Sequence, residues 1–132
     1  SCIAAATLLP QMFRHVRTAA RMEGLYVKLR ITDVGGRVTV LALLDSGNLL
    51  VEPVTGLPVV LLNACPGETA GGYPVRYAGV GGEGEVLCRH AKRAQVWLNG
   101  RWREIDVMIA KSPRHIAEAQ AIIGGIALPP QG

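Results

Sequence analysis

Apolar and polar residues alternate between Leu25 and Asp33, and this period of two is typical of a half-buried β-strand. Apolar residues at 27, 29 and 31 share one face, and polar residues at 28, 30 and 32 share the other. A return strand is predicted over residues 37–44, after a two-residue turn at Gly35-Gly36 that accommodates positive φ. Its last four residues are apolar on both faces, which predicts that it enters the centre of the domain.

Glycine and proline divide the rest of the chain into further short segments. Asn99-Gly100 is a strong hairpin signal that would pair Trp97 with Trp102. Residues 85–93 are compatible with a strand or a helix. Ser112-Pro113 resembles a helix N-cap followed by a first-turn proline, which predicts a short helix to about Gln120. The other predicted strands are residues 58–62, 74–78, 95–98 and 101–110.

The composition fits one β-rich domain. The 132 residues are 49% apolar, and 16 glycines with 8 prolines suit a fold with many turns. Aromatic residues make up only 5%, which argues against a base-stacking nucleic-acid platform, and a net charge of +4 is too mild to name a partner. No apolar stretch approaches the roughly 20 residues that span a bilayer.

The first 24 residues are predicted to be a basic linker or helix. Arg14, Arg17 and Arg21 are three or four positions apart and would share one helical face. A solvated face is the simpler explanation, and a juxtamembrane segment facing anionic lipid is the alternative. We therefore divide the chain into residues 1–24 and a domain over residues 25–132.

The cysteines, Cys2, Cys65 and Cys88, offer little for metal or redox chemistry, because no two of them form a Cys-x-x-Cys pair. Cys65, Cys88 and His90 could supply three metal ligands, but buried free thiols are the commoner explanation. We expect no metal, no cofactor and a reducing compartment.

Gly79, Gly81 and Gly84 have the spacing of the dinucleotide-binding fingerprint, with Asp106 about where a ribose-binding acid belongs. That fingerprint must follow a strand and open a helix within a βαβ unit, whereas the surrounding segments are predicted hairpins. A glycine-rich hairpin tip therefore fits better.

Asp45-Ser46-Gly47 is the strongest candidate for chemistry. Taken alone it is a turn, because these residue types are common in turns. Asp45 nevertheless ends an apolar strand, where an ionised carboxylate is costly unless donors hold it or a reaction uses it. The Ser46 hydroxyl and the Gly47 N–H could be those donors.

Three segments in this order resemble the retropepsin layout: residues 43–47, the glycines from Gly79, and Ile122-Ile123-Gly124. The resemblance implies an all-β, retropepsin-like closed β-barrel with hairpins, a flap and at most one or two short helices. It also implies that Asp45 is the catalytic acid, supported by Ser46 and Gly47. The implied flap and the segment behind the catalytic loop are, respectively, Gly79, Val80, Gly81, Gly82, Glu83 and Gly84, and Ile122, Ile123 and Gly124.

A closer resemblance is to the sporulation sigma-E factor processing peptidase, the stage II sporulation protein GA family. It lies in Leu44-Asp45-Ser46-Gly47-Asn48-Leu49 and in the stretch from Glu52 to Val60. The family implies transmembrane helices ahead of a cytoplasmic protease domain, so this chain would be the soluble half of a membrane-associated protein. The implied partners are a sigma-factor precursor, whose pro-segment is cleaved, and an activating signal protein, with no nucleic acid.

The chain departs from retropepsins in two places. Only residues 126–132 follow Gly125, and Pro129-Pro130 disfavours the terminal strand of the usual dimer sheet. Glu83 and Glu85 stand where retroviral flaps are apolar. A preference for basic substrate side chains is one interpretation, and surface charge is the simpler one.

Aspartic proteolysis needs two carboxylates that share one proton. The chain has one Asp-Ser-Gly, and the other acids, including Asp33, Glu52, Glu68 and Asp106, are predicted to lack its flanking donors. The second carboxylate is therefore predicted to be Asp45 of another copy, in a homodimeric aspartic endopeptidase. Two other classes stay open. One is a non-catalytic binding or dimerisation module on the same fold, and the other is nucleic-acid binding through the basic residues at 89, 92, 93, 101 and 103.

Overall fold

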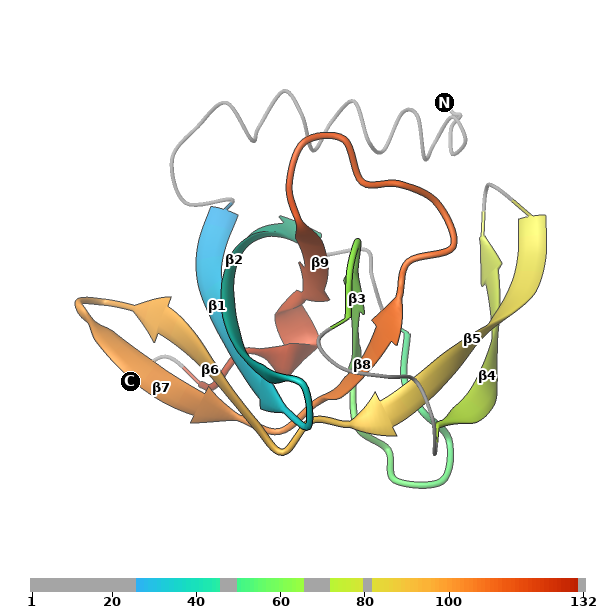
Figure 1. The fold of residues 1–132 in the computed structure, drawn as a ribbon, viewed down its shortest axis with the longest axis horizontal. Coiled ribbons are helices and arrows are strands. Elements are labelled where there is room, and N and C mark those ends of the chain that lie inside the picture. Colours follow the sequence, from blue (N-terminus) through green and yellow to red (C-terminus); the bar gives the residue numbers. More distant parts are fainter. Residues whose placement is uncertain (1–25, 46–49, 66–71, 80–81, 131–132) are drawn as a thin grey trace.

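The computed structural model describes residues 26–45, 50–65, 72–79 and 82–130 (Figure 1). The predictions for residues 1–24, Ser46, Gly47, Val80 and Gly81 lie outside these ranges. In the described part, no helix is long and apolar enough to cross a membrane.

The described residues form nine strands of one sheet, in the order β4-β5-β8-β3-β9-β2-β1-β6-β7. A short 3-10 helix, η1 (Gly125–Ala127), follows the last strand. The strands are β1 (Tyr26–Asp33), β2 (Gly36–Asp45), β3 (Val59–Leu62), β4 (Tyr73–Gly79), β5 (Gly82–His90), β6 (Arg93–Leu98), β7 (Arg101–Ile105), β8 (Met108–Lys111) and β9 (Ala121–Gly124).

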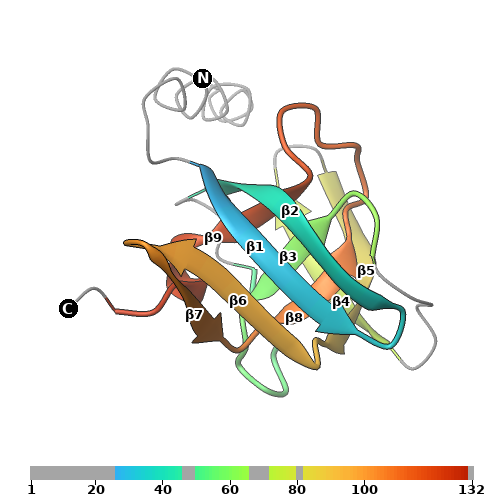
Figure 2. The same cartoon turned by 60° about the vertical axis from the view of Figure 1, so that its left-hand side comes forward.

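The all-β prediction is confirmed, but the sheet is open and the predicted closed barrel is wrong. The edge strands β4 and β7 lie at opposite ends of the long axis, each in a projecting hairpin (Figures 1 and 2). Every residue of β7 is exposed or only partly buried, as expected for an edge strand that no other strand covers.

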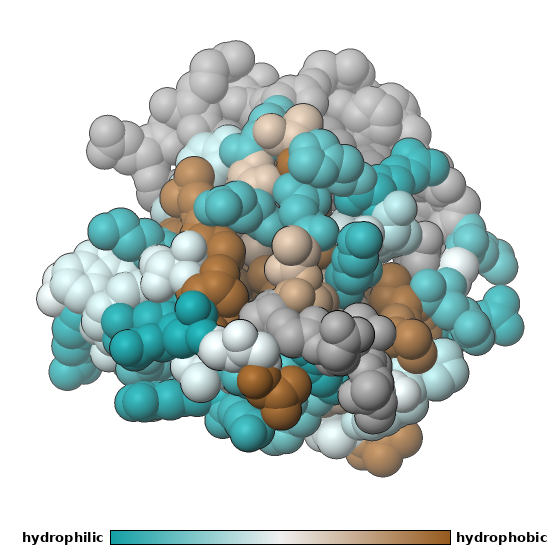
Figure 3. All heavy atoms as spheres, viewed as in Figure 1, coloured by the Kyte–Doolittle hydropathy of each residue, from teal (hydrophilic) through white to brown (hydrophobic). Residues whose placement is uncertain are grey.

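The sheet is bent, so that both of its halves contribute to one core. Leu29, Val96, Val60 and Ile109 come from β1, β6, β3 and β8, and all belong to the same buried cluster. A second cluster, around Val75, Val86 and Met108, lies where the β4–β5 hairpin joins β3 and β8. Outside the core, hydrophilic residues cover much of the face shown in Figure 3, and the apolar residues on it form small separate groups.

Local turn signals predicted the hairpins well. Trp97 pairs with Trp102 as predicted, and positive φ at Asn99 (52°) and Gly100 (83°) gives the turn its sharp reversal. The first hairpin is shifted by one residue from the prediction, because Gly36 already pairs with Asp33. Its turn residues are therefore Val34 and Gly35.

The predicted helix from Ser112 to about Gln120 is wrong, since the segment is an irregular loop. The reason lies 53 positions away in the sequence. The Asn63 amide donates to the carbonyls of Ile116 (3.0 Å) and Ala119 (3.2 Å) and accepts the Ile116 N–H (2.7 Å), which holds the loop backbone in a non-helical path.

The two remaining ambiguities are resolved as strands. Residues 85–93 belong to β5 and to the start of β6, with a short break between them. The predicted strand over 101–110 is two strands, β7 and β8, because the chain leaves β6 after Ile105 and crosses to pair with β3 and β5.

Candidate functional site

Asp45 is the last residue of β2, and it is only 9% exposed. β9 runs parallel to β2 there, with Leu44 opposite Ile123 and Asp45 opposite Gly124. Two segments that the sequence analysis singled out therefore meet at the end of β2. Ile123 is fully buried, so this end of the strand is attached to the main core.

Gln120 aligns β9 with β2, a role that the sequence analysis missed. Its backbone N–H donates to the Leu41 carbonyl (2.9 Å), and its side-chain oxygen accepts the Leu41 N–H (3.0 Å). The Gln120 carbonyl in turn accepts the Asn63 N–H (3.0 Å) at the end of β3. Gln120 therefore fixes the register of β9 against β2 and also bonds to the residue after β3, although these segments are distant in sequence.

The glycine-rich segment is the tip of an antiparallel hairpin, with Gly79 opposite Gly82, as predicted. The dinucleotide fingerprint is excluded, because β5 continues as a strand where that motif needs a helix. Asp106 instead contacts His90 on the surface. The sheet order places β8, β3 and β9 between this hairpin and β2, so it does not pair with the strand that carries Asp45.

The acidic residues near the tip, Glu83 and Glu85, lie on the surface close to one arginine. Glu83 forms an ion pair with Arg76 (3.5 Å), and both side chains are more than two-thirds exposed. Arg76 also lies directly opposite Glu85 in the hairpin register. This arrangement favours surface charge over a site for basic substrate side chains.

Glu52 is a buried carboxylate surrounded by donors, so the prediction that it lacks them is wrong. Only 1% of the residue is exposed. One oxygen accepts the Val54 N–H (2.6 Å), and the other accepts the N–H (2.7 Å) and hydroxyl (2.5 Å) of Thr55. The Tyr73 hydroxyl approaches that second oxygen at 3.3 Å. Burial raises the pKa of Glu52, but the hydrogen bonds from Thr55, Val54 and Tyr73 outweigh it and lower the pKa overall.

Part of this site was visible in the sequence. An acidic residue that accepts N–H groups two and three positions later, in Glu-Pro-Val-Thr, is a local turn pattern. The Tyr73 contact spans 21 positions and has no such local signal.

Asp33 is a second acid that the sequence analysis placed among residues without donors. It forms a buried ion pair with Arg89, with side-chain exposures of 4% and 12%. This ion pair links the end of β1 to β5, and it pairs the charge of Arg89 with a carboxylate of the same chain.

Cys65 and Cys88, the two cysteines in the described part of the chain, are poorly suited to metal or nucleophilic chemistry. Burial, with smaller contributions from Glu52 and Cys65, raises the pKa of Cys88 to about 11. Burial is also the main cause that raises the pKa of Cys65, and Arg89 opposes it. Both thiols are therefore protonated at neutral pH. Among the residues that the structure describes, no group of three or more Cys, His, Asp or Glu side chains could hold a metal ion.

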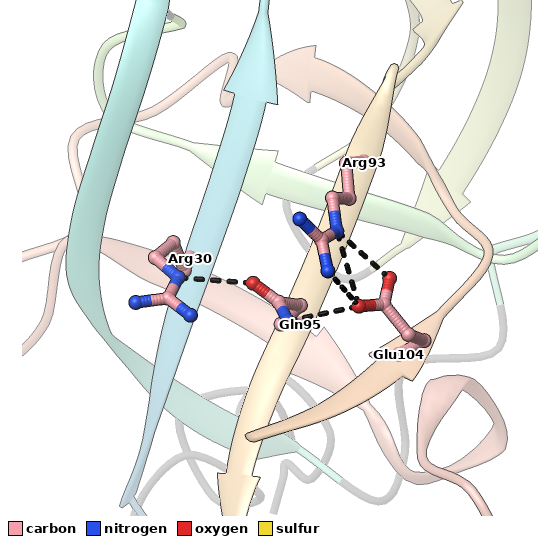
Figure 4. Close-up of polar contacts among 4 residues, drawn as sticks. All are labelled: Arg30, Arg93, Gln95 and Glu104. Carbon is pink, nitrogen blue, oxygen red and sulfur yellow. Dashed lines mark hydrogen bonds and ion pairs between the residues drawn. The ribbon is translucent and has the colours of Figure 1, made fainter.

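Two basic residues of the β1–β6–β7 face, Arg30 and Arg93, are connected by hydrogen bonds through Gln95 and Glu104 (Figure 4). Arg30 donates to Gln95 (3.0 Å), while Gln95 (2.8 Å) and Arg93 (2.7 Å) donate to Glu104. The Arg30 guanidinium also lies 4.0 Å from the ring centre of Trp102. Of the five basic residues that the nucleic-acid alternative invokes, Arg93 forms an ion pair with Glu104 and Arg89 forms one with Asp33, so two of those charges are paired within the chain.

One comparison with known proteins identifies a family. The family model described as sporulation factor SpoIIGA, a peptidase, matches residues 1–70, which is more than half of the chain. The matched region includes Asp45-Ser46-Gly47 and the turn that contains Glu52. No curated protein matches the chain.

Proposed function

The chain belongs to the peptidase family of the sporulation factor SpoIIGA, and we propose that it is an aspartic endopeptidase whose catalytic acid is Asp45. The observation that carries the proposal is the burial of Asp45 at the end of an apolar strand, opposite Gly124. A carboxylate in such a place is costly unless it is held or used.

The proposed mechanism needs a second carboxylate, and a second copy of the chain supplies it. One aspartate accepts a proton from the attacking water, while the other, protonated, donates a hydrogen bond to the scissile carbonyl. The chain contains one Asp-Ser-Gly, so the second carboxylate would be Asp45 of another copy, related to the first by a two-fold axis. Ser46 and Gly47 would support the catalytic loop.

The β4–β5 hairpin would act as the flap of a retropepsin-like fold. Its tip, from Gly79 to Gly84, would close over the substrate backbone and exclude water. Ile122, Ile123 and Gly124 would support the catalytic loop from behind. In this proposal residues 1–24 link the domain, residues 25–132, to a membrane region.

The proposed substrate is a sigma-factor precursor, whose pro-segment is removed at the cytoplasmic side of the membrane, with an activating signal protein as a further partner. A non-catalytic binding or dimerisation module with the same architecture is the second candidate. Glu52 supports this second candidate, because it is a buried acid whose two carboxylate oxygens accept hydrogen bonds within a turn and so have a structural role.

Substitution of Asp45 by asparagine separates these candidates, because it keeps the size of the side chain and removes the ionisable acid. We expect cleavage of the precursor by the complete protein to fall by about 10²–10⁴-fold or more in Asp45→Asn. Asp106→Asn, an exposed acid, is the matched control and should cleave normally. Equal cleavage by wild type and Asp45→Asn would refute the proposal.

Mixing tests the homodimer. When equal amounts of wild type and Asp45→Asn exchange subunits freely, only about one quarter of the dimers keep both aspartates, so activity should fall to about that fraction of the value for the same total of wild type. Activity of one half, with no dependence on dilution, would show that each copy works alone.

A further inference from the structure

Glu52 is at the centre of a tightly closed loop that precedes β3. Val51 forms a bridge with Pro58, and the Glu52 N–H donates to the Leu57 carbonyl (2.9 Å). The Gly56 N–H returns to the Glu52 carbonyl (2.8 Å), at a positive φ of 75° that favours glycine. The Glu52 backbone is therefore fixed by hydrogen bonds on both of its polar groups.

The side chain of Glu52 is fixed as well. Three donors from Val54 and Thr55, at 2.5–2.7 Å, engage both carboxylate oxygens. The Thr55 hydroxyl also accepts the Leu57 N–H (3.2 Å). A buried carboxylate with this many local donors forms a rigid anchor point, because any rotation would leave charge and N–H groups unsatisfied.

One further donor reaches this anchor from another element. Tyr73, whose hydroxyl lies 3.3 Å from Glu52, is the first residue of β4. Among the described strands, β4 pairs only with β5, and β5 pairs with β8 only through residues 88–90. Most of the β4–β5 hairpin therefore projects beyond the other strands of the sheet (Figure 1). The Tyr73 contact lies at the base of this projection, opposite Cys88 in the register.

We propose that Glu52 is a positioning residue that holds the base of the β4–β5 hairpin through the Tyr73 hydroxyl and so controls how readily the hairpin opens to admit a peptide. This inference rests on the proposed function, in which the hairpin covers the substrate. The Glu-Pro-Val-Thr-Gly turn would then take part in substrate capture. Glu52 itself would neither donate nor accept a proton in the reaction.

The protonation states of both groups suit this contact. The hydrogen bonds keep the pKa of Glu52 below its ordinary value, so it accepts as a carboxylate at neutral pH. Burial and the neighbouring Glu52 charge raise the pKa of Tyr73, so its hydroxyl stays protonated and donates. Hydrogen bonds to charged groups are stronger than those between neutral groups.

Tyr73→Phe tests the proposal with little change in shape, because it removes only the hydroxyl. We expect hydrogen exchange of the β4 and β5 amides to become about tenfold faster, in line with the loss of one hydrogen bond to a charged group. We also expect KM for the precursor to rise several-fold while kcat stays within a factor of two. Arg101→Gln, an exposed residue of β7 at the opposite edge of the sheet, is the matched control and should change neither quantity.

Exchange and cleavage separate the two proposals. Faster exchange together with a raised KM in Tyr73→Phe, and not in Arg101→Gln, supports the role of Glu52. Wild-type exchange in Tyr73→Phe, or equal effects of the two substitutions, overturns it. Faster exchange with unchanged KM refutes the role in capture without bearing on Asp45, whose own variant tests the protease proposal.

Glu52→Gln adds a second test through a double-mutant cycle. If the anchor acts through Tyr73, adding Tyr73→Phe to Glu52→Gln should accelerate exchange by clearly less than the tenfold expected in the wild-type background. Full additivity would overturn the proposed connection. Should Glu52→Gln fail to fold, Tyr73→Phe and its control decide the matter alone.

Discussion

Replacing Ile123 by alanine should strongly destabilise the domain, because this side chain is fully buried beside the strand that carries Asp45. The change removes three carbons, which at about 0.8 kcal/mol each gives about 2.4 kcal/mol of lost transfer free energy. Ile123 belongs to the main buried cluster, and a closely packed core relaxes only in part after such a truncation, so a cavity remains. We therefore expect a total loss of about 3–4 kcal/mol in the free energy of unfolding.

Urea denaturation followed by tryptophan fluorescence measures this loss. With an m-value of about 1.5 kcal/mol/M, the midpoint should fall by about 2 M. Ile122→Ala is the matched control, since the neighbouring side chain is the same residue but only half-buried, and it should cost about half as much or less. If the two variants lose equal stability, the main core does not extend behind Asp45 as described.

The thiols and the buried carboxylate give two further predictions. With a pKa of about 11, Cys88 is a thiolate in only about one molecule in a thousand at pH 8. In a Cys2→Ser background, iodoacetamide should therefore label Cys65 before Cys88, as measured by mass spectrometry. Equal labelling rates would contradict the burial of Cys88. Because the pKa of Glu52 is lowered from its ordinary 4.5 on folding, its contribution to stability is present above that pH and is lost as pH falls through the folded value. Urea midpoints of wild type should therefore fall more steeply below pH 4.5 than those of Glu52→Gln, and parallel curves would refute the assignment.

Features set by neighbouring residues were predictable from the sequence. Alternation predicted β1 and β2, and Asn99-Gly100 predicted the β6–β7 hairpin with its Trp97–Trp102 pair. These signals are local because strand faces and tight turns depend on a few adjacent residues.

Features set by distant residues were not predictable in the same way. The loop after Ser112 has the signals of a helix, but the Asn63 amide takes hydrogen bonds that the helix would use within itself. Closure of a barrel requires the two edge strands to pair with each other, and nothing in the local sequence of β4 or β7 indicates whether they lie close enough to do so. For the same reason the sequence carries a signal for the Val54 and Thr55 donors of Glu52 but none for the Tyr73 hydroxyl.

The parallel pairing of β2 with β9 also constrains the order in which the domain can fold. Leu41 and Gln120 are 79 positions apart, so the chain must close a very long loop before this contact forms. Contacts of such high sequence separation slow folding. During synthesis Asp45 emerges long before Gly124. The edge of β2 that pairs with β9 therefore stays unpaired until β9 has been made. Incomplete chains would thus expose an apolar strand edge and lack a finished site, so the activity could arise only after the ribosome has passed residue 124.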